Sequence, residues 1–178
     1  QDNARSRGQL VSDFLHTDMA IDDYAGQLDD LGFLYNGFNL LLCDRNTLMY
    51  YSNHGGGAQS LRPGVYALSN AALDTPWPKT LAAKQALQQW LQTPQPVGQL
   101  ATLLNNREKA ADEDLPSTGI PLENERSLSA QFIRTSNYGT RSSTGLIVDK
   151  SGNAEFLEQS YERGVATSSE QQLIENFW

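Results

Sequence analysis

Two short polar stretches of the sequence have residue types suited to chemistry. The first is Ser69-Asn70, which we expect at the carboxyl end of a short strand over residues 65–68. An asparagine held at a rigid junction can aim its amide NH₂ group at a developing oxyanion. Asparagine in a turn often bonds the neighbouring backbone instead, and the local pattern taken alone favours that second interpretation.

The second stretch, residues 138–144, places Arg141 between Thr140 and Ser142, at the entrance of a predicted strand over residues 145–148. A guanidinium group can bind a carboxylate through two hydrogen bonds, or keep its positive charge beside a thiolate. A surface ion pair explains an arginine here equally well. Hydroxyls in the predicted loop 115–121 more often bond the backbone than line a site.

Other kinds of site have little support in the sequence. Cys43 is the only cysteine and closes an apolar run, so we expect an inert thiol inside a sheet, and no internal disulfide can form. The two histidines, His16 and His54, lie in unrelated contexts, so a zinc or haem site has few ligands in this chain. We therefore expect no metal and no cofactor. Gly55-Gly56-Gly57 is not followed by a helix, as a phosphate-binding loop requires.

The composition is that of an ordinary globular protein. Hydrophobic residues make up 39% of the 178 residues and charged residues 19%. With 13 basic against 21 acidic residues, the net charge of −8 argues against a nucleic-acid partner. The apolar run 40–43 is far too short for stable membrane insertion. No signal peptide is visible, and we expect a cytoplasmic protein.

The elements that must position these residues follow from apolar periodicity and turn signals. An amphipathic pattern predicts helices over 7–16, from Thr17 as cap up to Gly32, from Thr75 as cap to 92, and over 97–104. A run of strand length at 38–43 reads as a strand buried on both faces, paired in a hairpin with 47–51. A second hairpin joins 145–148 to 154–159, and the tail 170–178 fits either an edge strand or a terminal helix. The sequence thus predicts an α+β protein with antiparallel sheets.

Five motifs, in order and spacing, resemble the NRDE family, which is also called the transport and Golgi organisation protein 2 family. The resemblance runs from about residue 6 to about Tyr161. Its motifs are Tyr35-Asn36-Gly37-Phe38-Asn39-Leu40-Leu41, Tyr50-Tyr51-Ser52-Asn53, Leu68 to Lys79, Leu115-Pro116-Ser117-Thr118-Gly119-Ile120 and Tyr138 to Thr144. The Met-Cys start and the Asn-Arg-Asp-Glu tetrapeptide of the family do not occur. We therefore expect a single domain over 1–178 that is the carboxyl-terminal part of one larger domain.

The resemblance implies a four-layer αββα arrangement like that of the amino-terminal-nucleophile hydrolases, of which this chain would be an incomplete portion. It further implies hydrolysis of a non-peptide C–N bond in a small amide by a cysteine that lies outside this chain. On this hypothesis Asn70 donates to the oxyanion and Arg141 orients the substrate or holds the thiolate. The expected substrate-binding residues are Asn36, Ser69, Thr140 and Ser142.

A second interpretation of the same resemblance is a non-catalytic carrier for haem or lipid-type ligands, linked to secretory organisation. Both interpretations predict a small-molecule ligand and, as a partner, the amino-terminal part of the same protein. The sequence does not decide whether the protein is an enzyme, and it does not indicate an oligomeric state.

Overall fold

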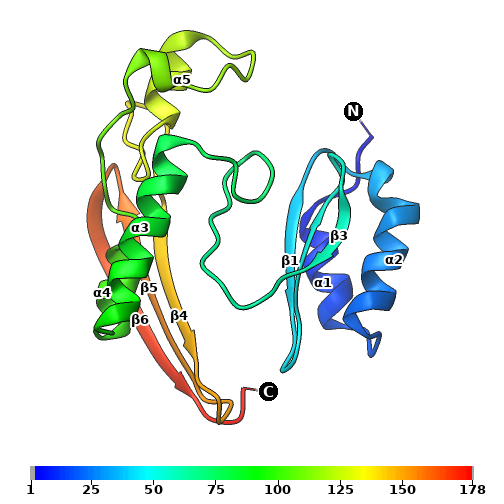
Figure 1. The fold of residues 1–178 in the computed structure, drawn as a ribbon. Coiled ribbons are helices and arrows are strands. Elements are labelled where there is room, and N and C mark those ends of the chain that lie inside the picture. Colours follow the sequence, from blue (N-terminus) through cyan, green and yellow to red (C-terminus); the bar gives the residue numbers. More distant parts are fainter. Residues whose placement is uncertain (1–2, 178) are drawn as a thin grey trace. The chain divides into compact units, whose positions relative to one another are not determined.

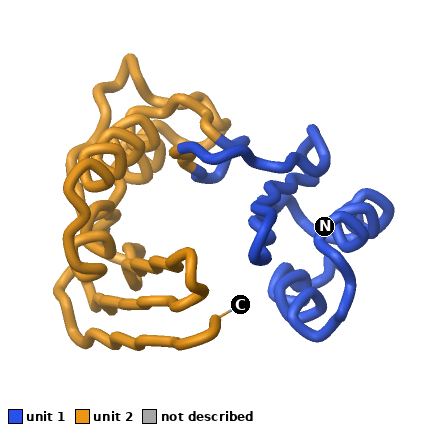
Figure 2. The backbone as a smooth tube through the Cα atoms, turned by 60° about the horizontal axis from the view of Figure 1, so that its bottom comes forward, with its two compact units in different colours: residues 1–64, 68–73 blue, residues 65–67, 74–178 orange. Residues whose placement is uncertain are grey.

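The computed structural model describes residues 3–177 and divides the chain into two compact units (Figure 2). Unit 1 contains the residues up to Gly64 together with Leu68–Leu73. Unit 2 contains Val65–Ala67 and the residues from Asp74 onward. Each unit has its own helices and its own three-stranded antiparallel sheet (Figure 1).

Unit 1 begins with two helices and continues into a sheet. The helices are α1 (Gly8–Leu15) and α2 (Ile21–Leu31), followed by the short 3-10 helix η1 (Gly32–Leu34). The sheet has the order β1 (Asn39–Cys43), β2 (Leu48–Ser52) and β3 (Gly57–Ser60), in which Leu41 pairs with Tyr50 and Tyr51 with Ala58.

The core of unit 1 joins the apolar faces of α1 and α2 to strand β2. Leu10, Tyr24 and Leu28 are buried together with Met49 and Tyr51. The two tyrosines bury a hydroxyl each, and both hydroxyls are satisfied by backbone carbonyls. Tyr24 OH donates to Leu10 O over 2.6 Å, and Tyr51 OH donates to Leu28 O over 2.8 Å. These bonds fix the helices against the sheet, because an unpaired buried hydroxyl would be costly.

Unit 2 has its helices in the first half and its strands in the second half. The helical elements are α3 (Pro78–Gln92), α4 (Val97–Thr102), η2 (Asp112–Asp114) and α5 (Leu122–Leu128). The strands are β4 (Ser142–Val148), β5 (Ala154–Glu162) and β6 (Val165–Ile174), in that order in the sheet. Helices α3 and α4 cover one face of this sheet (Figure 1).

A close approach of α4 to β4 depends on Gly145. A Cβ atom at this position would lie 2.9 Å from Val97 O and 3.0 Å from Ala101 N, closer than carbon atoms normally approach backbone. Glycine is therefore required here by packing rather than by its backbone conformation.

The predicted α+β class with antiparallel sheets is confirmed, and both predicted hairpins are present. The four-layer arrangement and the single domain over 1–178 remain predictions. The tail forms the edge strand β6, which begins earlier than predicted, at Val165. The strand β3 was missed, because its first residues continue the glycine run 55–57 and offer no apolar pattern.

The strand predicted over 65–68 is wrong. Ala67 instead bonds Asp74, whose φ of 59° is left-handed: Asp74 N donates to Ala67 O, and Ala67 N donates to Asp74 Oδ1, both over 2.8 Å. The predicted helix start is also wrong by two residues. Pro78 begins α3, and Thr75 gives its carbonyl to the hydroxyl of Thr80 rather than capping the helix.

The prediction that residues 38–43 are buried on both faces is wrong as well. Strand β1 is an edge strand of its sheet, and Leu41 is 49% exposed while Leu42 is buried. Cys43 lies on the same face of β1 as Leu41 and is exposed as well. Its burial was expected from the apolar run, but burial of the second face needs another element of the unit to cover it.

Candidate functional site

The backbone around Ser69 and Asn70 is fixed by the sheet of unit 1. Asn39 Nδ2 donates to Ala71 O over 2.9 Å. Tyr50 OH donates to Asn39 Oδ1 over 2.7 Å and accepts from Leu73 N over 3.2 Å. Side chains of β1 and β2 therefore hold the backbone directly after Asn70, at the carbonyl of Ala71 and the amide of Leu73.

The side chain of Asn70 itself is left exposed by this arrangement. Its carboxamide makes no hydrogen bond with the residues that the structure describes, so the backbone-bonding role expected from the local pattern is not observed. The neighbouring Ser69 is half-buried, and its carbonyl lies 3.5 Å from Asn39 Nδ2. A fixed backbone with an unengaged carboxamide leaves both NH donors available to a ligand.

The residues around Arg141 form a pocket in unit 2, which we call the arginine pocket. Its volume is about 290 Å³, and it lies between the segment that precedes β4 and the turn that joins β5 to β6. The lining residues are Arg134, Thr135, Ser136, Asn137, Tyr138, Gly139, Thr140, Arg141, Glu162, Arg163 and Gly164.

Hydrogen bonds within the segment before β4 give this wall of the pocket its shape. Thr135 N and Thr135 Oγ1 both donate to Tyr138 O, and Tyr138 N donates to Thr135 Oγ1. Thr140 N donates to Ile133 O, and Ile133 N donates to Thr140 Oγ1. The hydroxyl of Thr140, which we expected to bind substrate, is therefore already used by the backbone as an acceptor.

The opposite wall is the tight turn Arg163-Gly164. Both residues have positive φ, 50° and 77°, as the two central residues of a type I′ hairpin turn require. A Cβ on Gly164 would lie 2.7 Å from Cδ of Arg134, so the glycine lets the Arg134 side chain pass over the turn. Arg107 Nη2 also donates to Gly164 O over 2.8 Å and ties the turn to the segment after α4.

The electrostatic character of the pocket is opposite to that of the chain. Arg134, Arg141 and Arg163 oppose the single carboxylate Glu162, a net of +2 in the lining of the pocket, whereas the chain carries −8. Within residues 3–177, none of the three guanidinium groups takes part in an ion pair. Three unpaired guanidinium groups can receive a carboxylate or phosphate in a bidentate manner.

The predicted site residues fall into two groups. Thr140 and Arg141 line the arginine pocket, and Ser142, the exposed first residue of β4, follows them without lining it. Asn70 and Ser69 belong to unit 1, as does Asn36, which lies exposed in the loop after η1.

Sequence reasoning missed the other charged residues of the pocket, which are Arg134, Glu162 and Arg163. The signal that could have found Arg163 is its position before Gly164, a turn pair between two segments of strand character. No such signal exists for Arg134, which reaches the pocket through the packing of its side chain over Gly164.

The two other groups considered for chemistry have structural explanations. Although Cys43 is exposed, partial desolvation of its thiol raises the pKa, and the nearby charge of Asp44 raises it further, so thiolate is scarce at neutral pH. The buried carboxylate of Glu125 accepts from both the backbone N and the hydroxyl of Thr118, over 2.8 and 2.5 Å. The loop hydroxyl of Thr118 therefore serves the fold, although its partner is a side chain and not the backbone that we expected.

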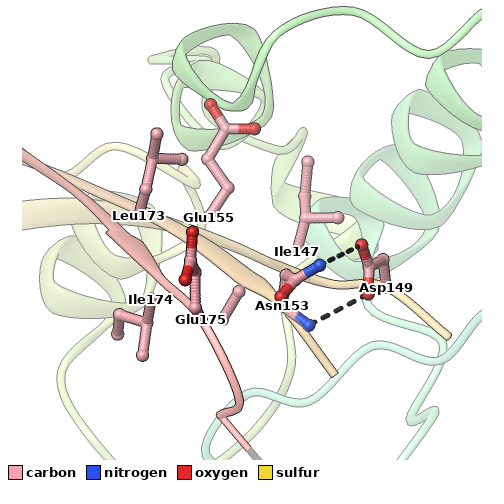
Figure 3. Close-up of a pocket in the computed structure, with 8 residues that line it drawn as sticks. Ile147, Asp149, Asn153, Glu155, Leu173, Ile174 and Glu175 are labelled. Atoms are coloured by element: carbon pink, nitrogen blue, oxygen red, sulfur yellow. Dashed lines mark hydrogen bonds between the residues drawn. The ribbon is translucent and has the colours of Figure 1, made fainter. Parts of the chain in front are cut away.

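A further pocket of about 360 Å³ lies at the end of the β4–β5 hairpin beside the last residues of β6 (Figure 3). Its acidic residues include Asp149, whose pKa is lowered because Asn153 N, Asn153 Nδ2 and neighbouring amides donate to the carboxylate. Asp149 is thus occupied in closing the hairpin turn. Among the described residues, no group of three or more His, Cys, Asp or Glu side chains is arranged to hold a metal ion.

No helix in the described part of the chain is long and apolar enough to cross a membrane. Comparison with models of protein families matches residues 1–163 to TANGO2, described as Transport and Golgi organisation 2.

Three curated proteins match most of the chain. The Transport and Golgi organization 2 homolog of Mus musculus is 37% identical over 177 residues, which is 89% of this chain and 63% of the relative. The Transport and Golgi organization protein 2 homologs of Bos taurus and Homo sapiens are 37% and 35% identical, with 89% and 88% of this chain covered and 63% and 62% of the relatives. The chain thus spans a little over three-fifths of the length of these relatives.

Proposed function

The chain belongs to the transport and Golgi organisation 2 family, and from this premise we propose that the arginine pocket binds the anionic group of a small-molecule ligand. The observation that carries this proposal is the set of three guanidinium groups, Arg134, Arg141 and Arg163, without ion-pair partners among the described residues. Unpaired arginines gathered on one face of an acidic protein repel each other, and a bound carboxylate or phosphate removes that repulsion.

The ligand classes implied by the family resemblance are compatible with this charge. Haem carries two carboxylates and lipid-type ligands carry acidic headgroups, so either could place its anion among the three arginines. The carrier function for such ligands, acting in the cytoplasm, is one form of the proposal.

The second form is hydrolysis of a non-peptide C–N bond in a small amide, within a four-layer domain completed by the amino-terminal part of the same protein. The observation that favours it is Asn70, whose carboxamide is unengaged while the surrounding backbone is fixed by Asn39 and Tyr50. On this proposal Asn70 donates to the tetrahedral oxyanion, Arg141 orients the substrate, and the cysteine nucleophile is supplied from outside these 178 residues.

Anion binding is tested by titrating the protein with inorganic phosphate and with succinate, observed by NMR chemical shifts at low salt. We expect Arg141→Ala to weaken binding by about 10- to 150-fold, since a hydrogen bond to a charged group contributes about 1.5–3 kcal/mol. Arg45→Ala, which removes an exposed arginine from the β1–β2 turn, is the matched control for overall charge. Equal weakening by both variants would refute a specific site.

Hydrolysis is tested separately, by release of amine from a panel of small N-acyl amides. Loss of an oxyanion donor lowers the rate by about 10²–10³, so Asn70→Ala should reduce turnover by that factor while leaving phosphate binding unchanged. Absence of turnover in the longest form of the protein, with anion binding retained, would support the carrier form.

A further inference from the structure

Lys79 is an amine in an unusual setting for a lysine. It is the second residue of α3, where the partial positive charge of the helix amino terminus disfavours a cation, and the first turn of α3 contains no acidic residue. Its side chain is half-buried. The family resemblance includes Lys79 in the Leu68 to Lys79 motif, but neither form of the proposed function uses it.

The amine of Lys79 is held by groups that carry no full negative charge. Nζ donates to Leu128 O, at the end of α5, over 2.9 Å. The ring of Trp77 lies 5.2 Å from Nζ. Within residues 3–177, no carboxylate is close enough to form an ion pair with this amine. The amine is therefore positioned without the partner that usually keeps a lysine protonated and inert.

The carboxylate of Glu125 has only a weak effect on the pKa of Lys79. Burial lowers the pKa of Lys79, and the charge of Glu125 only partly offsets this effect. The carboxylate of Glu125 is itself occupied by the amide and hydroxyl of Thr118. The neutral amine, which is the nucleophilic form, is thus favoured relative to an ordinary surface lysine.

Lys79 also lines a cavity of about 240 Å³, large enough for a small metabolite. The cavity lies between the start of α3, the segment after α4 and the segment after α5. Its charged lining residues are Lys79, Lys109 and Glu108, and polar groups come from Asn106, Ser129 and Gln131. Lys109 supplies a cation in the same lining that can bind a carboxylate of the ligand, and Glu108 is the opposing charge there.

We propose that Lys79 is a reactive amine that forms a Schiff base with a small carbonyl compound bearing a carboxylate, such as an aldehyde acid or 2-oxo acid, in this cavity. The Nζ lone pair adds to the carbonyl carbon, and the carbinolamine loses water to give an imine between Nζ and that carbon. No oxidant or reductant is needed for this step. The proposal is independent of the arginine pocket.

The experiment traps the imine with cyanoborohydride, which delivers hydride to the imine carbon and leaves a stable secondary amine. The probe is glyoxylate, at limiting concentration and neutral pH, and the modified residue is located by peptide mass spectrometry. The chain contains four lysines, at positions 79, 84, 109 and 150, so every alternative lysine is observed in the same digest. Lys84 is ion-paired with Asp74 over 2.8 Å and serves as the internal reference for an amine that has a carboxylate partner.

We expect the adduct to form first on Lys79 and to be lost in Lys79→Arg, which keeps a donor for Leu128 O but cannot form an imine. Lys150→Arg, the same change in an exposed hairpin turn, should leave the adduct undiminished. Melting curves of both variants check that the fold is retained. An adduct spread evenly over the four lysines, or one on Lys79 that appears only after unfolding, would overturn the proposal and leave Lys79 as a structural hydrogen-bond donor.

Discussion

Asp74 offers the most detailed test of how the segment between the two sheets is held. In unit 2 its backbone N donates to Ala67 O, and its Oδ1 accepts from Ala67 N, both over 2.8 Å. Its Oδ2 accepts from Lys84 Nζ over 2.8 Å. Its φ of 59° lies in the left-handed region, which aspartate, asparagine and glycine tolerate better than other residues.

Three substitutions separate these contributions. Asp74→Ala loses the hydrogen bond from Ala67 N, about 1 kcal/mol, and the partly exposed pair with Lys84, about 0.5 kcal/mol. It also places alanine in a left-handed conformation, at a cost of about 1 kcal/mol. We expect a total loss of about 2–3 kcal/mol in the free energy of unfolding. Asp74→Asn keeps the Ala67 bond and the backbone tolerance, and should lose about 0.5–1 kcal/mol. Lys84→Met removes only the ion pair between Lys84 and Asp74.

The assay is urea unfolding, followed at neutral pH and again in acid. Burial acts to raise the pKa of Asp74, but the hydrogen bonds from Lys84 and Ala67 and the charge of Lys84 outweigh it, so the folded-state pKa lies below its usual 3.8. A carboxyl group with a lowered pKa stabilises the fold above its unfolded pKa, and this contribution is lost as the pH falls through the folded pKa. The difference in the free energy of unfolding between wild type and Asp74→Asn should therefore be largest at neutral pH and should decrease below about pH 4.

The reasoning fails if Asp74→Ala and Lys84→Met cause equal losses, because the backbone bond and the left-handed conformation would then contribute nothing. It also fails if the difference in the free energy of unfolding between wild type and Asp74→Asn does not change between neutral pH and about pH 3.

Three further substitutions test packing, one in unit 1 and two in unit 2. Tyr50→Phe leaves Asn39 Oδ1 and Leu73 N without their partner. We expect the free energy of unfolding to fall by about 1–2 kcal/mol and the amide of Leu73 to exchange its hydrogen faster. Unchanged exchange at Leu73 would show that Tyr50 does not hold this backbone. Gly145→Ala should cost about 1–3 kcal/mol because the new methyl group meets the backbone of α4, measured by thermal unfolding. Gly98→Ala, where the nearest atom is 3.8 Å from the new Cβ, should instead be neutral or stabilising by up to about 1 kcal/mol. Equal effects of the two glycine substitutions would show that the α4–β4 approach is not tight.

The sequence predicted those elements whose signal is local. The helices α1 and α2 and both hairpins follow from the spacing of apolar residues and from turn residues within a few positions. The strand expected over 65–68 failed because a strand needs a neighbouring strand as partner, and within residues 3–177 the backbone of Ala67 bonds Asp74 instead. The exposure of Cys43 was missed because it depends on which face of β1 is covered.

The candidate site could be predicted only in part, for a similar reason. Thr140 and Arg141 were found because they are adjacent in one motif. Arg134 and Arg163 join them through a bridge between Arg134 and Gly139 and through the β5–β6 turn, which no local pattern relates. In unit 1, the bond from Asn39 to Ala71 spans 32 positions.

The structure separates the motif asparagines by what their side chains already bind. Asn53 Oδ1 accepts from Phe38 N, and its Nδ2 donates to Gly32 O. Likewise, Asn39 Oδ1 accepts from Tyr50 OH and Asn39 Nδ2 donates to Ala71 O. Their presence is explained by the fold, and their replacement should lower stability. Asn70 is exposed and binds nothing among the described residues, so folding does not explain it. Replacement of Asn70 should therefore leave unfolding unchanged within about 0.5 kcal/mol and alter only binding or turnover, which makes it the sharper probe of chemistry.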